Sequence, residues 1–124
     1  MTVILAEDDL DIQLVARLAL KRAGFVVKVV GNGLEAIEAV MQDIRRTNTK
    51  AIAAVPRDGW DPDAVDWSGR IALLLGGEGP GLGPAIVAQA DERVTVPMEL
   101  PVESLNVASS GAIIIYAARR ARNR

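Results

Sequence analysis

The chain contains no cysteine and no histidine, and its only aromatic residues are two tryptophans, one tyrosine and one phenylalanine. The absence of cysteine excludes disulfides, thiolate metal sites and a cysteine nucleophile. The absence of histidine removes the commonest general base and the commonest zinc ligand. No apolar run approaches the length of a membrane span, and no signal-peptide pattern opens the chain. We therefore expect a cytoplasmic protein that does not contact a membrane.

The residues that are present indicate one compact domain. The chain has 124 residues, of which 50% are hydrophobic and 24% charged, enough for a single core built mainly from Val, Ile, Leu and Ala. The net charge of -2 gives no general attraction to nucleic acid. Four arginines crowd the end of the chain, at Arg119, Arg120, Arg122 and Arg124. They are interpreted as cations at a helix C-terminus, with a small RNA-facing patch as the alternative.

Strand and helix patterns alternate along the chain. Apolar runs predict strands at residues 2–6, 25–30, 51–55, 71–75 and 94–96. Helical spacing of apolar residues, with capping and proline signals, predicts helices at residues 12–23, 34–46, 84–90 and 104–122. This alternation predicts a single α/β domain over residues 1–124, with a mostly parallel sheet and helices on both faces.

The chain is organised around residues 71–82, IALLLGGEGPGL. Glycines after a buried strand let a ligand touch the main chain, and ligands bind at the carboxyl ends of parallel strands. The stretch therefore predicts a backbone-lined pocket containing one carboxylate, Glu78. It lacks the Gly-Lys-Ser/Thr of a phosphate-binding loop and the dinucleotide GxGxxG spacing. The alternative is a glycine-rich connector that binds nothing.

Three acidic residues, Glu7, Asp8 and Asp9, follow the first strand. Carboxylate oxygens suit hard cations, so these residues are weak candidates for divalent metal binding. A solvated acidic cluster at a helix start is the favoured interpretation, and no specific metal site is expected.

Residues 1–42 resemble the first two βα units of a bacterial response-regulator receiver domain. The resemblance rests on ILAEDD at 4–9, AGF at 23–25 and GNGLEAIEAV at 31–40. In receivers such an acidic cluster holds magnesium beside a phosphoacceptor aspartate at the end of the third strand. Here the third strand ends in Val55-Pro56-Arg57, so a receiver-type signalling module is the least favoured function.

Residues 43–124 resemble the C-terminal half of TrmH-type RNA methyltransferases of the SPOUT superfamily. The motifs are LLLGGEGPGL at 73–82, ADERVTVPM at 90–98 and ESLNVASSGAIIIY at 103–116. The resemblance implies a deep trefoil knot that binds S-adenosylmethionine (SAM), and catalytic roles for Asn106 and Glu78. The implied cofactor-binding residues are Leu75, Gly76, Gly77, Glu78, Gly79, Gly81, Leu82, Val96, Met98, Leu100, Ser104, Leu105 and Asn106.

Together the two resemblances favour an engineered chimera, joined near residues 41–44 and without an evolved physiological function. Such a chain would keep the SAM-binding loops but transfer little or no methyl group. The essential arginine and asparagine of the TrmH type lie in the first half, which the chimera would have replaced, so Arg17 and Arg22 are expected to face solvent. The alternative function is an RNA ribose 2′-O-methyltransferase acting on tRNA or rRNA. The resemblance also implies a homodimer through the C-terminal helix, and RNA as a partner only if activity is retained.

Overall fold

A five-stranded parallel sheet forms the centre of the molecule. The computed structural model describes residues 2–6, 10–22, 26–30, 34–76, 83–96 and 107–123. The strand order is β2-β1-β4-β3-β5, and the four neighbouring pairs all run parallel. The strands are β1 (Thr2–Ala6), β2 (Val26–Val30), β3 (Lys50–Ala54), β4 (Ile71–Gly76) and β5 (Glu92–Val94). The prediction of an α/β fold with a parallel sheet is confirmed.

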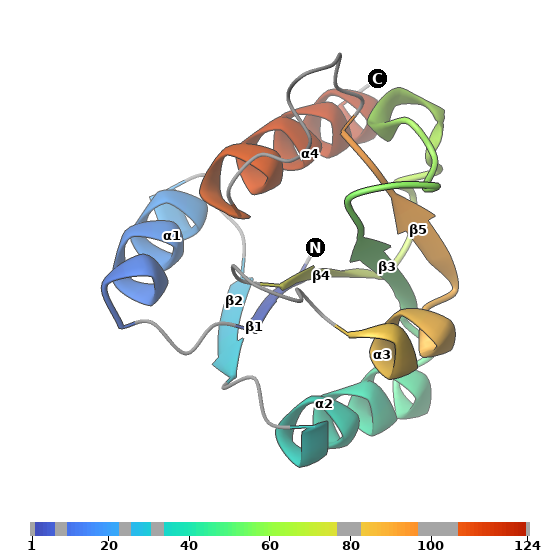
Figure 1. Cartoon of the computed structure of the whole chain (residues 1–124). Helices are drawn as coiled ribbons and strands as arrows, with labels where there is room; N and C mark the ends of the chain where they lie inside the picture. Colours follow the sequence, from blue (N-terminus) through green and yellow to red (C-terminus); the bar gives the residue numbers. More distant parts are fainter. Residues whose placement is uncertain are drawn as a thin grey trace.

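Helices cover both faces of this sheet. Helices α1 and α4 lie on one side and α2 and α3 on the other (Figure 1). The bounds are α1 (Leu10–Arg22), α2 (Leu34–Arg46), α3 (Pro84–Gln89) and α4 (Val107–Arg122), with a short 3-10 helix η1 at Pro62–Ala64. Two buried apolar clusters follow from this layering, one on each face of the sheet. Figure 1 places the C-terminal helix, in red, beside η1 and across the sheet from α2.

Helix α2 illustrates how the sequence pattern sets the packing. Its predicted bounds, 34–46, agree with the structure. Ile37, Met41 and Ile44 recur at helical spacing and are only 5%, 1% and 7% exposed. Burying each such side chain contributes about 1.5–3 kcal/mol relative to leaving it in water. This stripe therefore fixes which face of α2 meets the sheet.

The position of β1 corrects the interpretation of the first segment. Flavodoxin-like domains, to which receivers belong, have the strand order 2-1-3-4-5. Here β4 rather than β3 lies beside β1, and the two strands pair from Thr2↔Ala72 to Ala6↔Gly76. Residues 2–6 are thus an internal strand of the sheet whose neighbour is the strand preceding the glycine-rich stretch. The expectation of a receiver-type arrangement is wrong.

Smaller differences follow from strand pairing. The last strand was predicted at 94–96 from its valines, but β5 spans Glu92–Val94 because it pairs with β3 from Ile52↔Glu92 to Ala54↔Val94. The third strand likewise begins one residue earlier than predicted, at Lys50. Residues 77–82 and 97–106, on which the predicted knot depends, lie outside the described residues, so the knot stays a prediction.

Candidate active site

The carboxyl ends of the five strands meet at one edge of the sheet. Because all pairs are parallel, β1 ends at Ala6 beside Gly76 of β4, while β3 ends at Ala54 beside Val94 of β5. This is the edge at which open α/β sheets bind ligands. Leu75, the penultimate residue of β4, is 3% exposed and packs in the cluster under α4. The glycine-rich stretch follows directly in the sequence.

A close contact holds α4 against the end of β4. A Cβ atom at Gly111 would lie 3.0 Å from Cδ1 of Leu75, so a larger residue there would require the Leu75 side chain to shift by a few tenths of an ångström. Helix α4 begins at Val107, directly after Ser104, Leu105 and Asn106. Gly111 therefore marks a close approach between the helix that follows this triplet and the end of β4.

The described residues contain three of the predicted cofactor contacts. Leu75 and Gly76 end β4, and Val96 is half-buried and packs against the same apolar cluster as Leu75. The other predicted site residues lie outside the described residues: Gly77, Glu78, Gly79, Gly81, Leu82, Met98, Leu100, Ser104, Leu105 and Asn106. The weak metal candidates Glu7, Asp8 and Asp9 also lie outside them. Within the described ranges, no three acidic side chains come together as a metal site.

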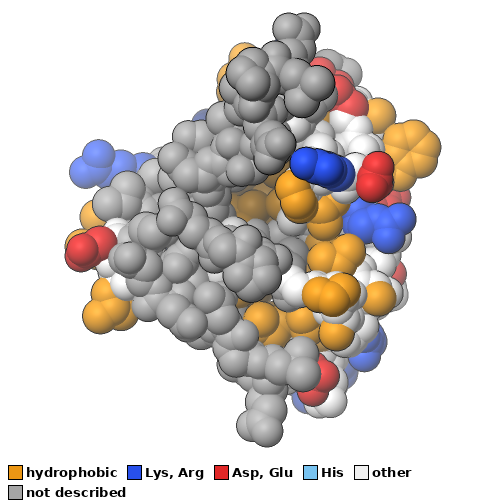
Figure 2. All heavy atoms as spheres, viewed as in Figure 1, with side chains coloured by type: hydrophobic (Ala, Val, Ile, Leu, Met, Phe, Trp, Pro, Cys, Tyr) orange, Lys and Arg blue, Asp and Glu red, His pale blue; other side chains and the backbone are white. Residues whose placement is uncertain are grey.

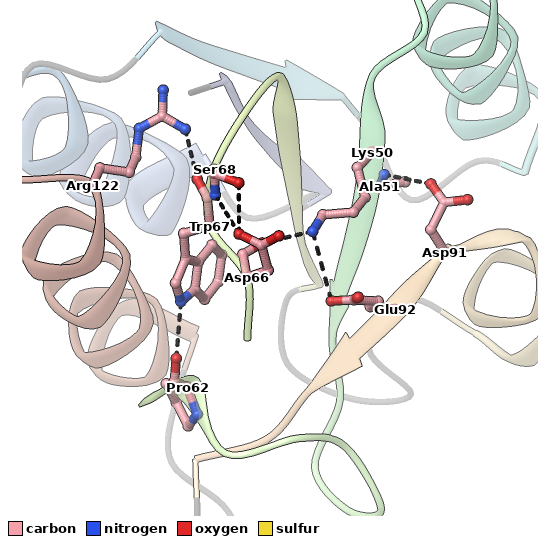
Figure 3. Close-up of polar contacts among 9 residues, drawn as sticks. All are labelled: Lys50, Ala51, Pro62, Asp66, Trp67, Ser68, Asp91, Glu92 and Arg122. Carbon is pink, nitrogen blue, oxygen red and sulfur yellow. Dashed lines mark hydrogen bonds and ion pairs between the residues drawn. The ribbon is translucent and has the colours of Figure 1, made fainter. Parts of the chain in front are cut away.

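The opposite, amino edge of the sheet carries a polar network that sequence reasoning missed (Figure 3). The Nζ atom of Lys50 donates to the carbonyl oxygen of Asp66 at 2.6 Å and lies 3.9 Å from the carboxylate of Glu92. The carboxylate of Asp66 accepts from the hydroxyl of Ser68 at 2.6 Å and from its amide at 3.0 Å. The hydroxyl and amide of Ser68, helped by the charge of Lys50, lower the pKa of Asp66 below its ordinary value of 3.8.

Trp67 and Arg122 join this network to the C-terminal helix. The indole of Trp67 is 2% exposed, and its Nε1 atom donates to the carbonyl oxygen of Pro62 at 2.8 Å. The Nη1 atom of Arg122 donates to the carbonyl oxygens of Trp67 at 2.8 Å and Gly69 at 2.9 Å. These bonds fix the end of α4 on the turn before β4. Arg122 therefore has a specific structural role that its predicted place near a helix terminus did not reveal.

The family is decided by comparison with known proteins. The model of the SpoU rRNA Methylase family matches residues 3–116. The chain belongs to the SpoU rRNA methylase family. Among curated proteins it is 32% identical, over 105 residues, to the 23S rRNA (guanosine-2′-O-)-methyltransferase RlmB of Acinetobacter baylyi, covering 85% of this chain and 34% of that protein. Over 51 residues it is 49% identical to an uncharacterized tRNA/rRNA methyltransferase of Mycobacterium tuberculosis, covering 41% of this chain and 18% of that one. The chain thus spans about a third or less of these relatives.

Solved structures agree on the fold of this SpoU family member. An RNA 2′-O ribose methyltransferase superposes with a TM-score of 0.82 at 19% identity, covering 100% of this chain and 57% of the other. The SpoU methyltransferase AviRb of Streptomyces viridochromogenes, in complex with the cofactor AdoMet (SAM), gives a TM-score of 0.74 at 19% identity, covering 99% and 58%. Members of the SpoU family bind SAM.

The interpretation as an engineered chimera is therefore wrong. One family model extends from residue 3 to residue 116 and crosses the supposed junction at 41–44 without a break. The expectation that the chain lacks an evolved function is wrong for the same reason. Residues 1–42 are not a receiver fragment. The receiver resemblance misled because parallel α/β units commonly place carboxylates at a helix start, where they complement the helix dipole, and glycines in the turns.

Two further observations bear on the remaining predictions. Arg17 and Arg22 are exposed on α1, as expected, although the reason given, a replaced first half, does not hold. In the part of the chain that the structure describes, the helices are too short or too polar to cross a membrane.

Proposed function

We propose that this SpoU domain is an RNA ribose 2′-O-methyltransferase that uses SAM. The observation that carries the proposal is the carboxyl edge of the sheet. There β4 ends at Gly76 immediately before the glycine-rich stretch, and α4, held against Leu75 at Gly111, begins directly after the Ser104–Asn106 triplet. Both segments resemble the cofactor-binding motifs of the family.

The described residues at this edge fit the cofactor chemically. Val96 is apolar and half-buried and suits contact with an adenine ring, while Gly76 leaves the main chain open to hydrogen bonds. The side chain of Leu75 is buried under α4 and supports this edge from within the core. Bound SAM supplies the methyl group. In this proposal Asn106 orients the accepting ribose, and Glu78 holds a neighbouring loop through backbone amides. Methyl transfer to a hydroxyl also needs a route for the proton.

We assign the arginine of the family's first-half motif to Arg17. Helix α1 follows β1, so it starts at the carboxyl edge and runs back toward the amino edge, where β2 begins. Arg22 lies five residues further along α1 than Arg17, which at the rise of an α-helix is about 7.5 Å further from the carboxyl edge. Arg17 is thus the better placed of the two arginines on this helix.

A second copy of the chain is the proposed partner. Leu10, Leu14 and Leu18 form a stripe on α1 and are 77%, 59% and 51% exposed. Tyr116 and Ile113 on α4, which covers the same face of the sheet, are 65% and 43% exposed. Such apolar surface on neighbouring helices marks a protein interaction site. A homodimer through α1 and α4 would place the exposed Arg17 near the partner subunit.

The test is a methyl-transfer assay with SAM labelled on its methyl group and unmodified tRNA and rRNA transcripts. We expect label in RNA at positions where the phosphodiester bond resists alkaline hydrolysis, since a methylated 2′-oxygen cannot attack it. Arg17→Ala should lower the rate by about a hundredfold or more, and Arg22→Ala serves as the matched control. Label at base atoms, or none with a chain that binds SAM, would contradict the proposal.

A further inference from the structure

Trp60 is exposed, and its backbone is hydrogen-bonded to the β5 edge of the sheet. Its side chain is 63% exposed. Its amide nitrogen nevertheless donates to the carbonyl oxygen of Arg93 at 2.8 Å, and its carbonyl oxygen accepts from the amide of Thr95 at 2.9 Å. These bonds form a parallel bridge between Trp60 and Val94. The chain therefore holds a large aromatic ring in water in a defined place.

Gly59 strengthens this anchoring. Its amide donates to Oγ1 of Thr95 at 2.9 Å, and a Cβ atom at Gly59 would lie 2.6 Å from that oxygen and 2.8 Å from the carbonyl carbon of Val94. Covering the open edge of β5 with this loop also protects the edge from pairing with other chains. That protection comes from the backbone of residues 59 and 60, and it leaves the exposed indole unexplained.

A hollow of about 280 Å³ lies beside Trp60. One wall is apolar, from Val87, Ala88 and Ala90 at the end of α3. Four charged residues also line the hollow: Asp58, Asp91, Glu92 and Arg93. Figure 2 shows hydrophobic, acidic and basic side chains together on the side of the molecule where β5 lies.

Some charged side chains in this hollow already have partners within the protein, and others do not. Asp91, also in the lining, accepts from the amide of Ala51 at 2.7 Å through its Oδ2 atom, and the carboxylate of Glu92 lies 3.9 Å from Lys50. Among the described residues, the side chains of Asp58 and Arg93 make no hydrogen bond or ion pair. One carboxylate and one guanidinium are thus free to bind a ligand beside the indole.

We propose that this hollow, the Trp60 site, binds an unpaired guanosine nucleotide of the RNA substrate. The indole offers a face on which a base stacks. The carboxylate of Asp58 has two acceptor oxygens, which match the adjacent N1–H and N2–H donors of guanine, a pair that adenine, cytosine and uracil do not present. Arg93 supplies the cation for a neighbouring phosphate.

The backbone of Trp60 is anchored at the carboxyl end of β5, and the hollow extends from it along β5 toward Ala90 and Asp91, on the amino side. Trp60 pairs with Val94, the last residue of β5, and β5 runs parallel to β3 and so to β4, which ends at Gly76. A nucleotide held there would belong to RNA that follows the β5 side of the sheet toward its carboxyl edge and so toward the proposed methyl-transfer site. This inference rests on the proposed function, because it takes RNA as the substrate.

The test compares two labelled single-stranded oligoribonucleotides, one of uridine alone and one with a single central guanosine, by fluorescence polarisation. We expect the guanosine oligonucleotide to bind more tightly to the whole chain. Trp60→Ala should weaken its binding by about tenfold, and Trp60→Phe should restore most of the affinity. Val26→Ala, at an exposed residue on β2 at the opposite edge, is the control and should bind normally.

The two charged residues make separable contributions. Asp58→Ala should remove the preference for guanosine while leaving the uridine oligonucleotide bound as before. Arg93→Ala should weaken both oligonucleotides alike and reduce the slope of affinity against salt by about one phosphate contact. Calorimetric SAM titration of the same variants should show unchanged cofactor affinity.

These measurements separate the inference from the proposed function. If the chain binds SAM but Trp60→Ala binds RNA normally, or no oligonucleotide binds at all, the Trp60 site is refuted. If the unmodified chain does not bind SAM, the proposed function is refuted instead. If Trp60→Ala changes the molecular mass in sedimentation and leaves RNA binding intact, the indole belongs to a protein contact, and the RNA assignment is wrong.

Discussion

Helices α1 and α2 have the same length, 13 residues, and the same place in a βαβ unit, but they treat their apolar residues differently. Helix α2 buries Ile37 and Met41 against the sheet. Helix α1 leaves Leu14 and Leu18 more than half exposed. Both helices contain enough apolar residues to pack on a sheet, and the exposed leucines of α1 form the surface that the proposed homodimer would cover. The difference separates residues that hold the fold from residues that are left exposed on its surface.

The largest effect on stability should come from removing a buried apolar side chain of α2. Met41→Ala removes a side chain that is 1% exposed, so we expect a loss of about 2–5 kcal/mol in the free energy of unfolding. Leu14→Ala, on α1, should change it by no more than about 0.5 kcal/mol at concentrations where the chain is monomeric. Urea unfolding followed by circular dichroism measures both. Similar losses for the two variants would show that Leu14 is part of the core.

The two tryptophans of the segment between β3 and β4 also differ in burial, since Trp67 is buried and Trp60 is exposed. Trp67→Phe removes the bond from Nε1 to the carbonyl oxygen of Pro62 and leaves that oxygen without its partner, which should cost about 1–3 kcal/mol. Trp60→Phe, at a 63% exposed residue, should cost less than about 0.5 kcal/mol. Thermal or urea unfolding distinguishes the variants, and an unaffected Trp67→Phe would contradict the proposed role of the buried bond.

The role of the exposed leucines of α1 is tested by measuring self-association. Leu14→Glu puts a charge into the proposed interface, where burying it unpaired is costly, so we expect the dimer dissociation constant to rise by about tenfold or more. Gln42→Glu, an exposed position on α2, adds the same charge elsewhere and should leave the constant unchanged. Sedimentation equilibrium gives both values. A monomeric unmodified chain at high concentration would exclude this dimer.

The smallest effect concerns pH. The pKa of Asp66 is lowered in the folded chain, so its contribution to stability is present above about pH 4 and is lost as the pH falls through the lowered value. Asp66→Asn should therefore be less stable than the unmodified chain at neutral pH, and the difference should shrink below about pH 4. Because the side chain is exposed, the effect should be small. A difference that stayed constant down to pH 2 would show that ionisation of Asp66 contributes nothing.

Much of the fold followed from the sequence because strong local signals agreed with the tertiary packing. Helix α2 was predicted with its bounds, because its apolar stripe is long and regular and a Gly31-Asn32-Gly33 sequence precedes it. Strand β5 was misplaced because pairing with β3, and not the run of valines, decides which residues join the sheet. The bridge at Trp60 could not be predicted, because backbone bonds to a distant strand leave no apolar periodicity in the loop.

Residues of the candidate site were predicted only where the sequence contains a recognisable motif. The glycine-rich stretch and the residues before α4 were recognised by resemblance, and Leu75, Gly76 and Val96 lie at the expected edge. The first half was assigned to the wrong family because acidic strand ends and glycine turns are shared by many parallel α/β units. Asp58 and Arg93 gave no signal, since their proximity to Trp60 depends on how the loop crosses β5.

Calorimetric titration with SAM and with its product S-adenosylhomocysteine tests the central claim most directly. The account predicts saturable binding with a dissociation constant in the micromolar range, which corresponds to a binding free energy of about 8 kcal/mol. It also predicts a strong loss of affinity in a Glu78→Ala and Asn106→Ala double variant that remains folded. Binding would place the cofactor motifs in working order at the carboxyl edge of this sheet. No binding to a chain that circular dichroism shows to be folded would contradict the assignment of this domain as a SAM-dependent methyltransferase.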